Sequence, residues 1–488
     1  MWSQSFWVNE TATLSSATIG WRIFGTGRTT MLFFYWMILN YLGPLDWAFR
    51  LSSLFFSIIT LISIYHISIM IANRQAAILA SCWFIFSPYA VDHGLQIRDY
   101  SIGAALLSLI VLWQLSYITA TRQKTQGHRV RCLPLLISFF MWEVHPHYFA
   151  MMYMLISFPT LFLFDLHNNR EETGIPWYRR VIRHPFLAPI LTLLFLVSFT
   201  AAETLKSLIF ASKGLHYRGA VADSITTRTP SELIGFWTNG SIILLGLLVV
   251  SLGVSAWLHL SNKHPSIRCP RLVLVLLTMT TLPVLLTMII QHRLSGIYAE
   301  RYLFFWFPMI CVLFGIVIVQ LLRLPTIAIA QLKSFEAKVS WAGVCFILIL
   351  IIYSSQSGLS VDRYGDMRGA VDYISEQAGE ESVSIISSPT KTSLAYYVDQ
   401  RDLDPVMSVG SWSEATFNEC PEDSTPDLCI ESVMNIDSDV VAVVSIAEKD
   451  WIFESTDGLL EELGYAHDNS ERFDSKGDEV WIYRKANA

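Results

Sequence analysis

Residues 51–71 read LSSLFFSIITLISIYHISIMI, a run that contains no Asp, Glu, Lys or Arg. About twenty such residues form a helix long enough to cross the ~30 Å hydrocarbon core of a bilayer. Further stretches of similar length and character are Ser101–Ala120, Phe186–Ile209, Ile242–Leu260 and Tyr302–Leu322. The sequence therefore predicts a polytopic α-helical membrane protein with about ten transmembrane helices.

The overall composition agrees with lipid as the solvent for most of the chain. Of the 488 residues, 53% are hydrophobic and 15% are charged, whereas about 25% of the residues in an ordinary soluble domain are charged. The net charge of −7 does not describe the whole chain, because most of the acidic residues lie beyond residue 360. The membrane part is instead locally basic, and its Lys and Arg residues indicate its orientation.

Lys and Arg gather in alternate loops, among them residues 122–131, 170–183 and 323–338. Because membrane insertion retains basic loops in the cytoplasm, these loops are predicted to be cytoplasmic. A last helix over about Ser340–Tyr353 then runs outward, so that the residues after it lie outside the cytoplasm. The sequence thus predicts a multi-pass membrane protein with an extracytoplasmic C-terminal domain.

Two domains are predicted, a transmembrane domain over residues 1–354 and an extracytoplasmic α/β domain over residues 355–488. Within the first, residues 1–50 are expected to form an outer loop, in which Met31–Leu42 is a short interfacial or re-entrant helix. Residues 1–30 contain no apolar run long enough to span a membrane. Either a short N-terminus is translocated, or a preceding helix is missing from the gene model.

The C-terminal domain is rich in Asp, Glu and Ser. Its periodicity predicts helices and strands that together form a small βαβ-type sandwich. The predicted helices are Asp366–Gln377, Thr390–Val398 and Gly458–Leu463, and the predicted strands are Ser382–Ser387, Val440–Ile446 and Glu479–Arg484. Cys420 and Cys429 are expected to form a disulfide in an oxidising compartment, with two free thiols as the alternative.

Polar residues gather in four clusters on the predicted outer face. The clusters are Trp7-Val8-Asn9-Glu10, His93–Tyr100, His145-Pro146-His147-Tyr148 and Ala299-Glu300-Arg301-Tyr302. Ionisable residues at a membrane rim are costly, so these clusters are functional candidates that together predict a cleft.

Each cluster alone also fits a structural role. Arg98 with Asp99 fits an ion pair that caps a helix, and His145 or His147 fits a hydrogen-bonded residue at the rim. The tyrosines that fit an interfacial aromatic belt are Tyr100, Tyr148 and Tyr302.

The order of these motifs resembles the C-type (GT-C) membrane glycosyltransferase superfamily. The motifs are Trp7–Glu10, Pro44–Ser52 (PLDWAFRLS), Gln96–Ser101 (QIRDYS), His147-Tyr148 and Arg301–Leu303. The nearest likeness is to the branch of protein O-mannosyltransferases and aminoarabinose transferases, which is similar to glycosyltransferase family 39. The resemblance spans nearly the whole chain, and its motifs are short and degenerate.

The resemblance implies an enzyme that transfers a sugar, mannose-like or other, from a polyprenyl-phosphate-linked donor. The acceptor is a protein, lipid or glycan outside the cytoplasm, and the transfer inverts the anomeric centre. The expected partners are therefore the lipid bilayer, this donor and this acceptor, with no nucleic acid.

The resemblance also implies roles for particular residues. An acidic residue of the first outer loop removes the proton of the acceptor hydroxyl, which assigns this role to Glu10, beside Asn9. Cations hold the leaving phosphate, and they are Arg98, Lys213, Arg218 and Arg301. The other substrate-binding candidates are Asp99, Tyr100, His145, His147, Tyr148 and Tyr302.

Two positions depart from the family pattern and leave alternatives open. The family usually has Asp at the position of Asn9 and an acid at that of Gln96, and an amide does not accept a proton as a carboxylate does. An inactive relative that binds lipid-linked sugar is therefore one alternative. A transporter is the other, although transporters place ionisable residues near the bilayer midplane. Metal dependence stays open, since Glu10, Asp99 and the histidines can ligate a divalent cation but show no diagnostic spacing.

Overall fold

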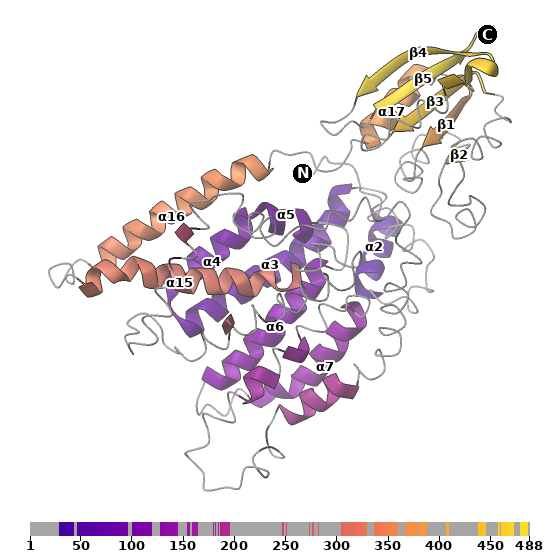
Figure 1. The fold of residues 1–488 in the computed structure, drawn as a ribbon. Coiled ribbons are helices and arrows are strands. Elements are labelled where there is room, and N and C mark those ends of the chain that lie inside the picture. The colour runs from indigo at the N-terminus through magenta and orange to yellow at the C-terminus, as the bar shows by residue number, and fades with distance from the viewer. Residues whose placement is uncertain are drawn as a thin grey trace. The chain divides into compact units, whose positions relative to one another are not determined.

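The structure is a computed structural model that describes about half of the chain. The described residues are 29–42, 46–95, 100–119, 127–144, 304–328, 336–359, 367–379, 381–387, 407–408, 438–445, 457–458, 460–472 and 479–486, with short pieces between 154 and 282. The chain divides into two compact units, one with Met1–Gly20, Tyr35–Phe49 and Val361–Ala488, the other with Trp21–Phe34 and Arg50–Ser360. We call the second the helical unit and Val361–Ala488 the tail (Figure 1).

Helix α3 (Asp46–Ile71) has the surface of a helix in lipid. Its exposed side is an apolar stripe in which each side chain is between 45% and 57% exposed: Leu51, Phe55, Ile58 and Ile62. Its buried side carries polar residues, including Arg50, Ser53 and Thr60. Helices of soluble proteins show the opposite arrangement, because water solvates their polar side. Among the described residues, α3 is the one helix long and apolar enough to cross a membrane, over Trp47–Ile71.

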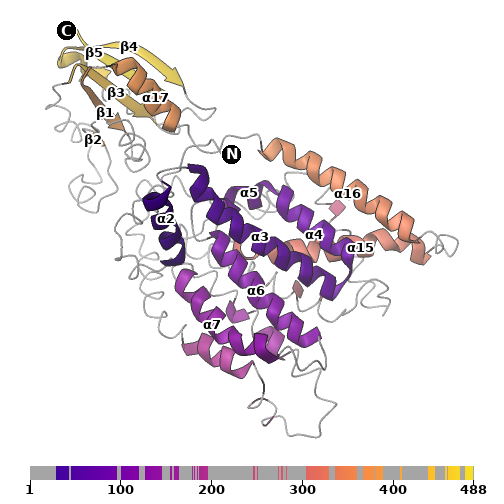
Figure 2. The ribbon, with the colours of Figure 1, turned by 180° about the vertical axis from the view of Figure 1, so that it is seen from behind.

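Helices α4 (Arg74–Phe86) and α15 (Phe307–Ala328) lie side by side in both ribbon views (Figures 1 and 2). Gly315 makes this close approach possible, because a Cβ at that position would overlap the Ala76 carbonyl oxygen and lie 2.9 Å from the Ala80 nitrogen. Small residues at a contact of this kind let two backbones approach closely.

Helix α16 (Glu336–Leu359) packs against both α4 and α15. A buried polar contact joins the three helices. Gln75 Oε1 on α4 accepts a hydrogen bond from Ser340 Oγ on α16 at 2.9 Å and one from Arg323 Nη2 on α15 at 3.4 Å. The contact fixes the end of α15 relative to the starts of α4 and α16.

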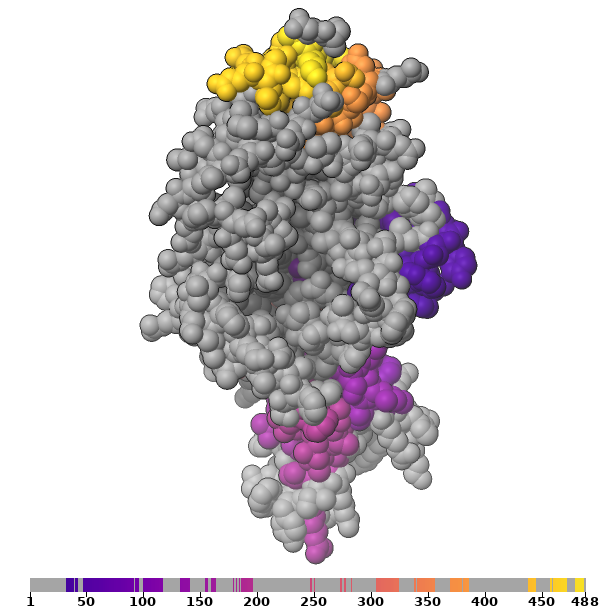
Figure 3. Space-filling model, turned by 90° about the vertical axis from the view of Figure 1, so that its right-hand side faces the viewer, coloured from indigo at the N-terminus to yellow at the C-terminus, as the bar shows by residue number. Residues whose placement is uncertain are grey.

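Four further described helices are α2 (Thr29–Tyr41), α5 (Pro88–Gly94), α6 (Tyr100–Thr119) and α7 (Gly127–Val144). Helix α2 exposes several large apolar side chains, namely Phe33, Phe34, Met37 and Tyr41. Figure 3 shows indigo, N-terminal residues of the described chain at the surface. An exposed apolar face of this kind suits the interfacial position predicted for this segment.

The predicted helical stretches at Leu51–Ile71 and Ser101–Ala120 are confirmed as α3 and α6. The stretch at Tyr302–Leu322 becomes helix only at Phe307, after a short turn at Phe304 and Phe305, and continues to Ala328. The last predicted helix, α16, is longer than expected at both ends. Most of Phe186–Ile209 and all but three residues of Ile242–Leu260 lie outside the described residues, so the number of spans stays a prediction.

The tail contains a five-stranded sheet in the order β2-β1-β3-β5-β4. The strands are β1 (Val383–Ser387), β2 (Met407–Ser408), β3 (Val440–Ser445), β4 (Tyr465–Arg472) and β5 (Glu479–Lys485). Strand β1 is parallel to β2 and β3, whereas β5 is antiparallel to β3 and β4. Helix α17 (Met367–Ala378) packs on β3 and β5 (Figure 1).

The predicted helix at Asp366–Gln377 and the predicted strands at β1, β3 and β5 are confirmed within one or two residues. Residues 457–462 include helical positions where Gly458–Leu463 was predicted, and Thr390–Val398 lies outside the described residues. Strand β4 was not predicted, because its polar sequence YAHDNSER lacks the apolar alternation of a half-buried strand. The parallel pairing of β1 and β3 agrees with the predicted βαβ-type arrangement. Strand β4, which pairs antiparallel with β5, is an addition to that arrangement.

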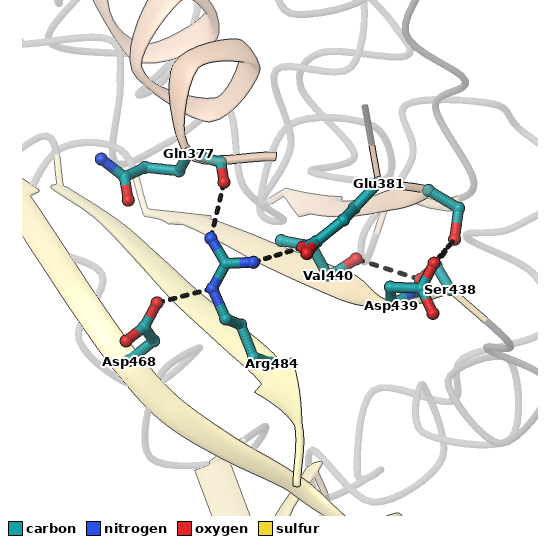
Figure 4. Close-up of polar contacts among 8 residues, drawn as sticks. Gln377, Glu381, Ser438, Asp439, Val440, Asp468 and Arg484 are labelled. Atoms are coloured by element: carbon teal, nitrogen blue, oxygen red, sulfur yellow. Dashed lines mark hydrogen bonds and ion pairs between the residues drawn. The ribbon is translucent and has the colours of Figure 1, made fainter. Parts of the chain in front are cut away.

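Arg484 joins three elements of the tail (Figure 4). Its Nε donates to Asp468 Oδ2 on β4 at 2.7 Å, and its Nη2 donates to the carbonyl oxygen of Gln377 on α17 at 2.6 Å. Its Nη1 pairs with Glu381, just before β1. The hydrogen bond to Asp468, followed by the nearby negative charge, raises the pKa of Arg484, so the guanidinium is charged at every relevant pH.

Candidate active site

Tyr100 is the one predicted site residue that lies among the described residues. It is the first residue of α6, and its side chain is fully buried. Its ring centroid lies 6.1 Å from that of His93 and 6.0 Å from that of Phe305. A tyrosine of an aromatic belt would face the lipid surface, so burial argues against that alternative for Tyr100. Its contact with substrate stays a prediction.

The other predicted site residues lie outside the described residues: Asn9, Glu10, Gln96, Arg98, Asp99, His145, His147, Tyr148, Lys213, Arg218, Arg301 and Tyr302. The same holds for the predicted disulfide between Cys420 and Cys429. Their roles stay predictions. The cysteines that the structure does describe, Cys82, Cys132, Cys311 and Cys345, are free.

Two of the predicted motifs are flanked by described residues that contact each other. His93 comes shortly before residues 96–99, and Phe304 follows Arg301 and Tyr302. The His93 and Phe304 ring centroids are 6.0 Å apart, and Tyr89 contacts both rings, at 4.7 Å and 5.8 Å. His93 and Phe304, which are about 200 residues apart in sequence, therefore lie close together in the helical unit.

A hydrogen bond from α3 adds a third element to this junction. Ser57 Oγ donates to the carbonyl oxygen of Gly94 at 2.9 Å. Gly94 is the last residue of α5, and the N–H of Leu95 closes that helix by donating to the Val91 carbonyl oxygen at 3.2 Å. We call Ser57, His93, Gly94, Tyr100 and Phe304 the junction.

The junction is a buried aromatic cluster with a few polar atoms. His93 is 4% exposed, and Tyr89, Tyr100 and Phe304 are fully buried. Rings in this cluster meet mostly edge to face or tilted, the arrangements that aromatic pairs prefer. The junction therefore packs the described flanks of both motifs together.

Arg50 is a candidate that sequence reasoning did not assign to the phosphate. It lies at the start of α3, on the same side as Ser53 and Ser57, and is 5% exposed. A buried ionisable residue at the end of a membrane helix is a functional candidate by default. The signal was present in PLDWAFRLS, where an arginine precedes an apolar run by one residue.

Within the described part of the chain, no group of three or more His, Cys, Asp or Glu side chains is placed to hold a metal ion. The residues that the sequence offered as ligands, Glu10, Asp99, His145 and His147, lie outside this part. Metal dependence therefore stays open.

No family model and no curated protein sequence matches the chain. Among solved structures, ArnT from Cupriavidus metallidurans in the apo state is similar, with a TM-score of 0.52, 10% identity and coverage of 99% of this chain and 95% of ArnT. ArnT bound to undecaprenyl phosphate has a TM-score of 0.47 and 11% identity, with coverage of 93% of this chain and 88% of ArnT. The Archaeoglobus fulgidus oligosaccharyltransferase in the apo form has a TM-score of 0.44 and 10% identity, with coverage of 92% of this chain and 65% of that protein.

At this level of identity, the likeness to ArnT shows the fold. The chain therefore shares the fold of ArnT, and its described part is mostly helical with a small sheet. This likeness agrees with the GT-C resemblance of the sequence motifs.

Proposed function

We propose that this protein is a membrane glycosyltransferase that transfers a sugar from a polyprenyl-phosphate-linked donor to an acceptor outside the cytoplasm. The fold shared with ArnT supports this proposal, and ArnT from the same source has been solved with undecaprenyl phosphate bound. A shared fold alone does not fix function, so the site must carry the rest of the argument.

The junction is the observation that carries the proposal. It places His93 and Gly94, which precede Arg98 in sequence, beside Phe304, which follows Arg301. Arg98 and Arg301 belong to these two motifs. Two arginines supplied by separate segments suit a phosphate, because guanidinium groups bind its oxygens in paired hydrogen bonds.

The proposed reaction is a single displacement with inversion. Glu10 takes the proton of the acceptor hydroxyl, whose oxygen attacks the anomeric carbon from the side opposite the phosphate. The bond between that carbon and the phosphate oxygen breaks, and the electron pair leaves with the polyprenyl phosphate. Arg98 and Arg301, with Lys213, Arg218 and the buried Arg50, stabilise the negative charge that develops there.

In the proposal, the remaining predicted residues surround the general base and the phosphate-binding cations. Asn9 lies beside the base, and Asp99, Tyr100 and Tyr302 lie beside the arginines in sequence. His145, His147 and Tyr148 form the third outer cluster and complete the substrate site. The tail lies outside the cytoplasm, on the side where the acceptor is found.

The experiment that tests this function uses purified full-length protein and a panel of polyprenyl-phosphate sugars. Release of polyprenyl phosphate, together with a glycosylated acceptor, is the expected result. Glu10→Gln serves as the matched control, because it keeps the size of the side chain but cannot take the proton. No release from any donor in the panel would contradict the proposal.

The two arginines make a separate prediction. Arg98→Ala and Arg301→Ala are each expected to weaken binding of undecaprenyl phosphate by about tenfold or more, because each removes a charge-assisted contact of about 1.5–3 kcal/mol. Acceptor binding should change little. Isothermal titration with each ligand separates the two effects, and unchanged donor affinity in both variants would assign these arginines to structural ion pairs.

An inactive relative that binds lipid-linked sugar is the second candidate, favoured by Asn9 and Gln96. Such a protein would bind undecaprenyl phosphate and release none from any sugar donor. The binding and release measurements together therefore distinguish the two functions.

A further inference from the structure

Three basic residues lie at one end of the group formed by α4, α15 and α16. Arg74 is the first residue of α4, Arg323 lies near the end of α15, and Lys338 is the third residue of α16. The sequences of these helices contain one acidic residue, Glu336, at the start of α16. We call Arg74, Arg323 and Lys338 the basic end, because they give this end of the three helices an excess of positive charge.

A buried polar contact brings the three segments of the basic end together. Gln75 Oε1 accepts hydrogen bonds from Arg323 Nη2 and Ser340 Oγ, and Gln75 and Ser340 are both buried. Arg74 directly precedes Gln75, and Lys338 is two positions before Ser340. The end of α15 and the start of α16 lie side by side in both ribbon views (Figures 1 and 2). Because Gln75 is uncharged, its hydrogen bond holds the guanidinium of Arg323 without neutralising it.

The side chains of the basic end reach the surface of the helical unit. Arg74 and Lys338 are exposed, and Arg323 is partly exposed. A positive charge is costly inside the hydrocarbon core, so Lys and Arg at the ends of membrane helices extend toward the headgroup layer. The basic end is therefore placed to meet the headgroups of lipids.

An exposed apolar stripe on α16 begins beside Lys338. It contains Trp341, Phe346, Ile349 and Tyr353, which are 40%, 60%, 64% and 75% exposed and lie on the same face of the helix as Lys338. Trp is enriched where the membrane meets water, so Trp341 marks the level of the interface. A phospholipid has the same order of groups, a charged headgroup followed by apolar chains.

We propose that the basic end binds the headgroup of an anionic phospholipid, whose acyl chains lie along the exposed stripe of α16. The phosphate oxygens accept charge-assisted hydrogen bonds from the guanidinium and ammonium groups. A zwitterionic headgroup carries its own cation, so the excess of positive charge selects an anionic one. The sequence predicts that this end is cytoplasmic, and the cytoplasmic leaflet is the one that attracts basic residues. This site is separate from sugar transfer and does not depend on the proposed function.

The experiment uses purified full-length protein in a neutral detergent, and native mass spectrometry counts the lipids bound. Phosphatidylglycerol and phosphatidylcholine are titrated separately. A third arm adds glycerophosphoglycerol, which is the headgroup of phosphatidylglycerol without acyl chains, as a competitor. This arm distinguishes a lipid from a soluble phosphate compound that offers the same oxygens.

The variants are Arg74→Gln, Lys338→Gln and the double variant. Both side chains are exposed, so their replacement leaves the contact between Gln75, Arg323 and Ser340 in place. Arg179→Gln is the matched control, because it removes an exposed arginine from another predicted cytoplasmic segment, outside the three helices. The thermal midpoint without added lipid checks that each variant is folded.

We expect wild-type protein to bind phosphatidylglycerol more tightly than phosphatidylcholine. Arg74→Gln and Lys338→Gln should each weaken phosphatidylglycerol binding about fivefold, the effect of one basic residue near an anionic headgroup. The double variant should lose about 25-fold, because the two losses multiply when the residues contribute independently. Phosphatidylcholine binding should stay the same in every variant, and Arg179→Gln should bind both lipids as the wild type does.

Several results would overturn this inference. Equal affinity of the wild type for the two lipids would show that the basic end selects no anionic headgroup. Unchanged phosphatidylglycerol binding in the double variant would place the lipid elsewhere. An equal loss in Arg179→Gln would show general attraction to basic residues and no particular site. Displacement of the lipid by glycerophosphoglycerol at the same concentration would show that the stripe of α16 contributes nothing.

Discussion

Glu10 is the residue on which the proposed chemistry depends, since it is the carboxylate of its motif and its neighbour Asn9 cannot act as a base. Removing a positioned general base costs on the order of 10² to 10⁴ in rate. Glu10→Gln is therefore expected to abolish measurable sugar transfer while undecaprenyl phosphate binding stays as in the wild type. Release of polyprenyl phosphate from a sugar donor measures sugar transfer, and isothermal titration measures binding of undecaprenyl phosphate.

Asn9→Asp is the companion variant. A working enzyme whose base is Glu10 should change little when the acid typical of the family is restored. Transfer that appears only in Asn9→Asp would show that the natural protein lacks a catalytic base and is the inactive relative. Full activity in Glu10→Gln would remove Glu10 from the mechanism.

Tyr483 gives the tail a predictable response to alkaline pH. Its hydroxyl donates to Asp457 Oδ1 at 3.0 Å, and burial, followed by this hydrogen bond, raises its pKa far above the ordinary value. The unfolded chain loses the phenol proton near pH 10, so folded-state stability is unaffected below about pH 10 and falls as pH rises above it. Scanning calorimetry of the full-length protein should show this fall, and Tyr483→Phe should make it shallower. An unchanged slope in Tyr483→Phe would contradict the assignment.

At the scale of elements, the sequence identifies most helices and strands whose pattern is set by burial. The buried strands β1 and β3 are apolar, and α17 carries its apolar residues at helical spacing, so each follows from local pattern. The polar edge strand β4 escapes prediction because pairing with β5 supplies its stability, and no local pattern records that pairing. Helix α4 is also missed, since it is only 13 residues long.

The candidate site is less predictable from sequence than the elements. The motifs at residues 96–99 and 301–302 were predicted to converge, but the contacts at their flanks depend on tertiary packing. The hydrogen bond from Ser57 to Gly94 joins two helices, and a serine within an apolar run gives no sign of its partner. Arg50 stands directly before an apolar run in the sequence, but its burial follows only from the structure.

The α4–α15 contact allows a prediction at this scale. A methyl group at Gly315 would overlap backbone atoms of Ala76 and Ala80, which a side-chain rotation cannot relieve. Gly315→Ala is therefore expected to destabilise the helical unit by about 1–3 kcal/mol, the usual cost of overpacking. The thermal midpoint of the full-length protein measures this effect.

Gly343 on α16 provides the matched control. A methyl group there would meet the end of the Leu322 side chain, which can rotate away. Gly343→Ala should consequently lower the thermal midpoint much less than Gly315→Ala. Equal losses in the two variants would show that the close approach of α4 and α15 has no special importance.

At the scale of the whole molecule, the orientation of the tail decides whether the proposed function is feasible. The basic residues at 323–338 lie around the start of α16, and basic loops are retained in the cytoplasm during insertion. This predicts that α16 runs outward, so that the sheet of the tail lies on the same side as the acceptor. A membrane-impermeant reagent is expected to label Lys485 in intact cells whose outer envelope is permeable, while Lys338, at the start of α16, is labelled only after the membrane is broken. Labelling of both lysines in sealed cells would show that α16 does not cross the membrane and would change the number of spans by one. Labelling of Lys338 alone would place the tail in the cytoplasm and so separate it from an extracytoplasmic acceptor, whatever sugar the protein carries.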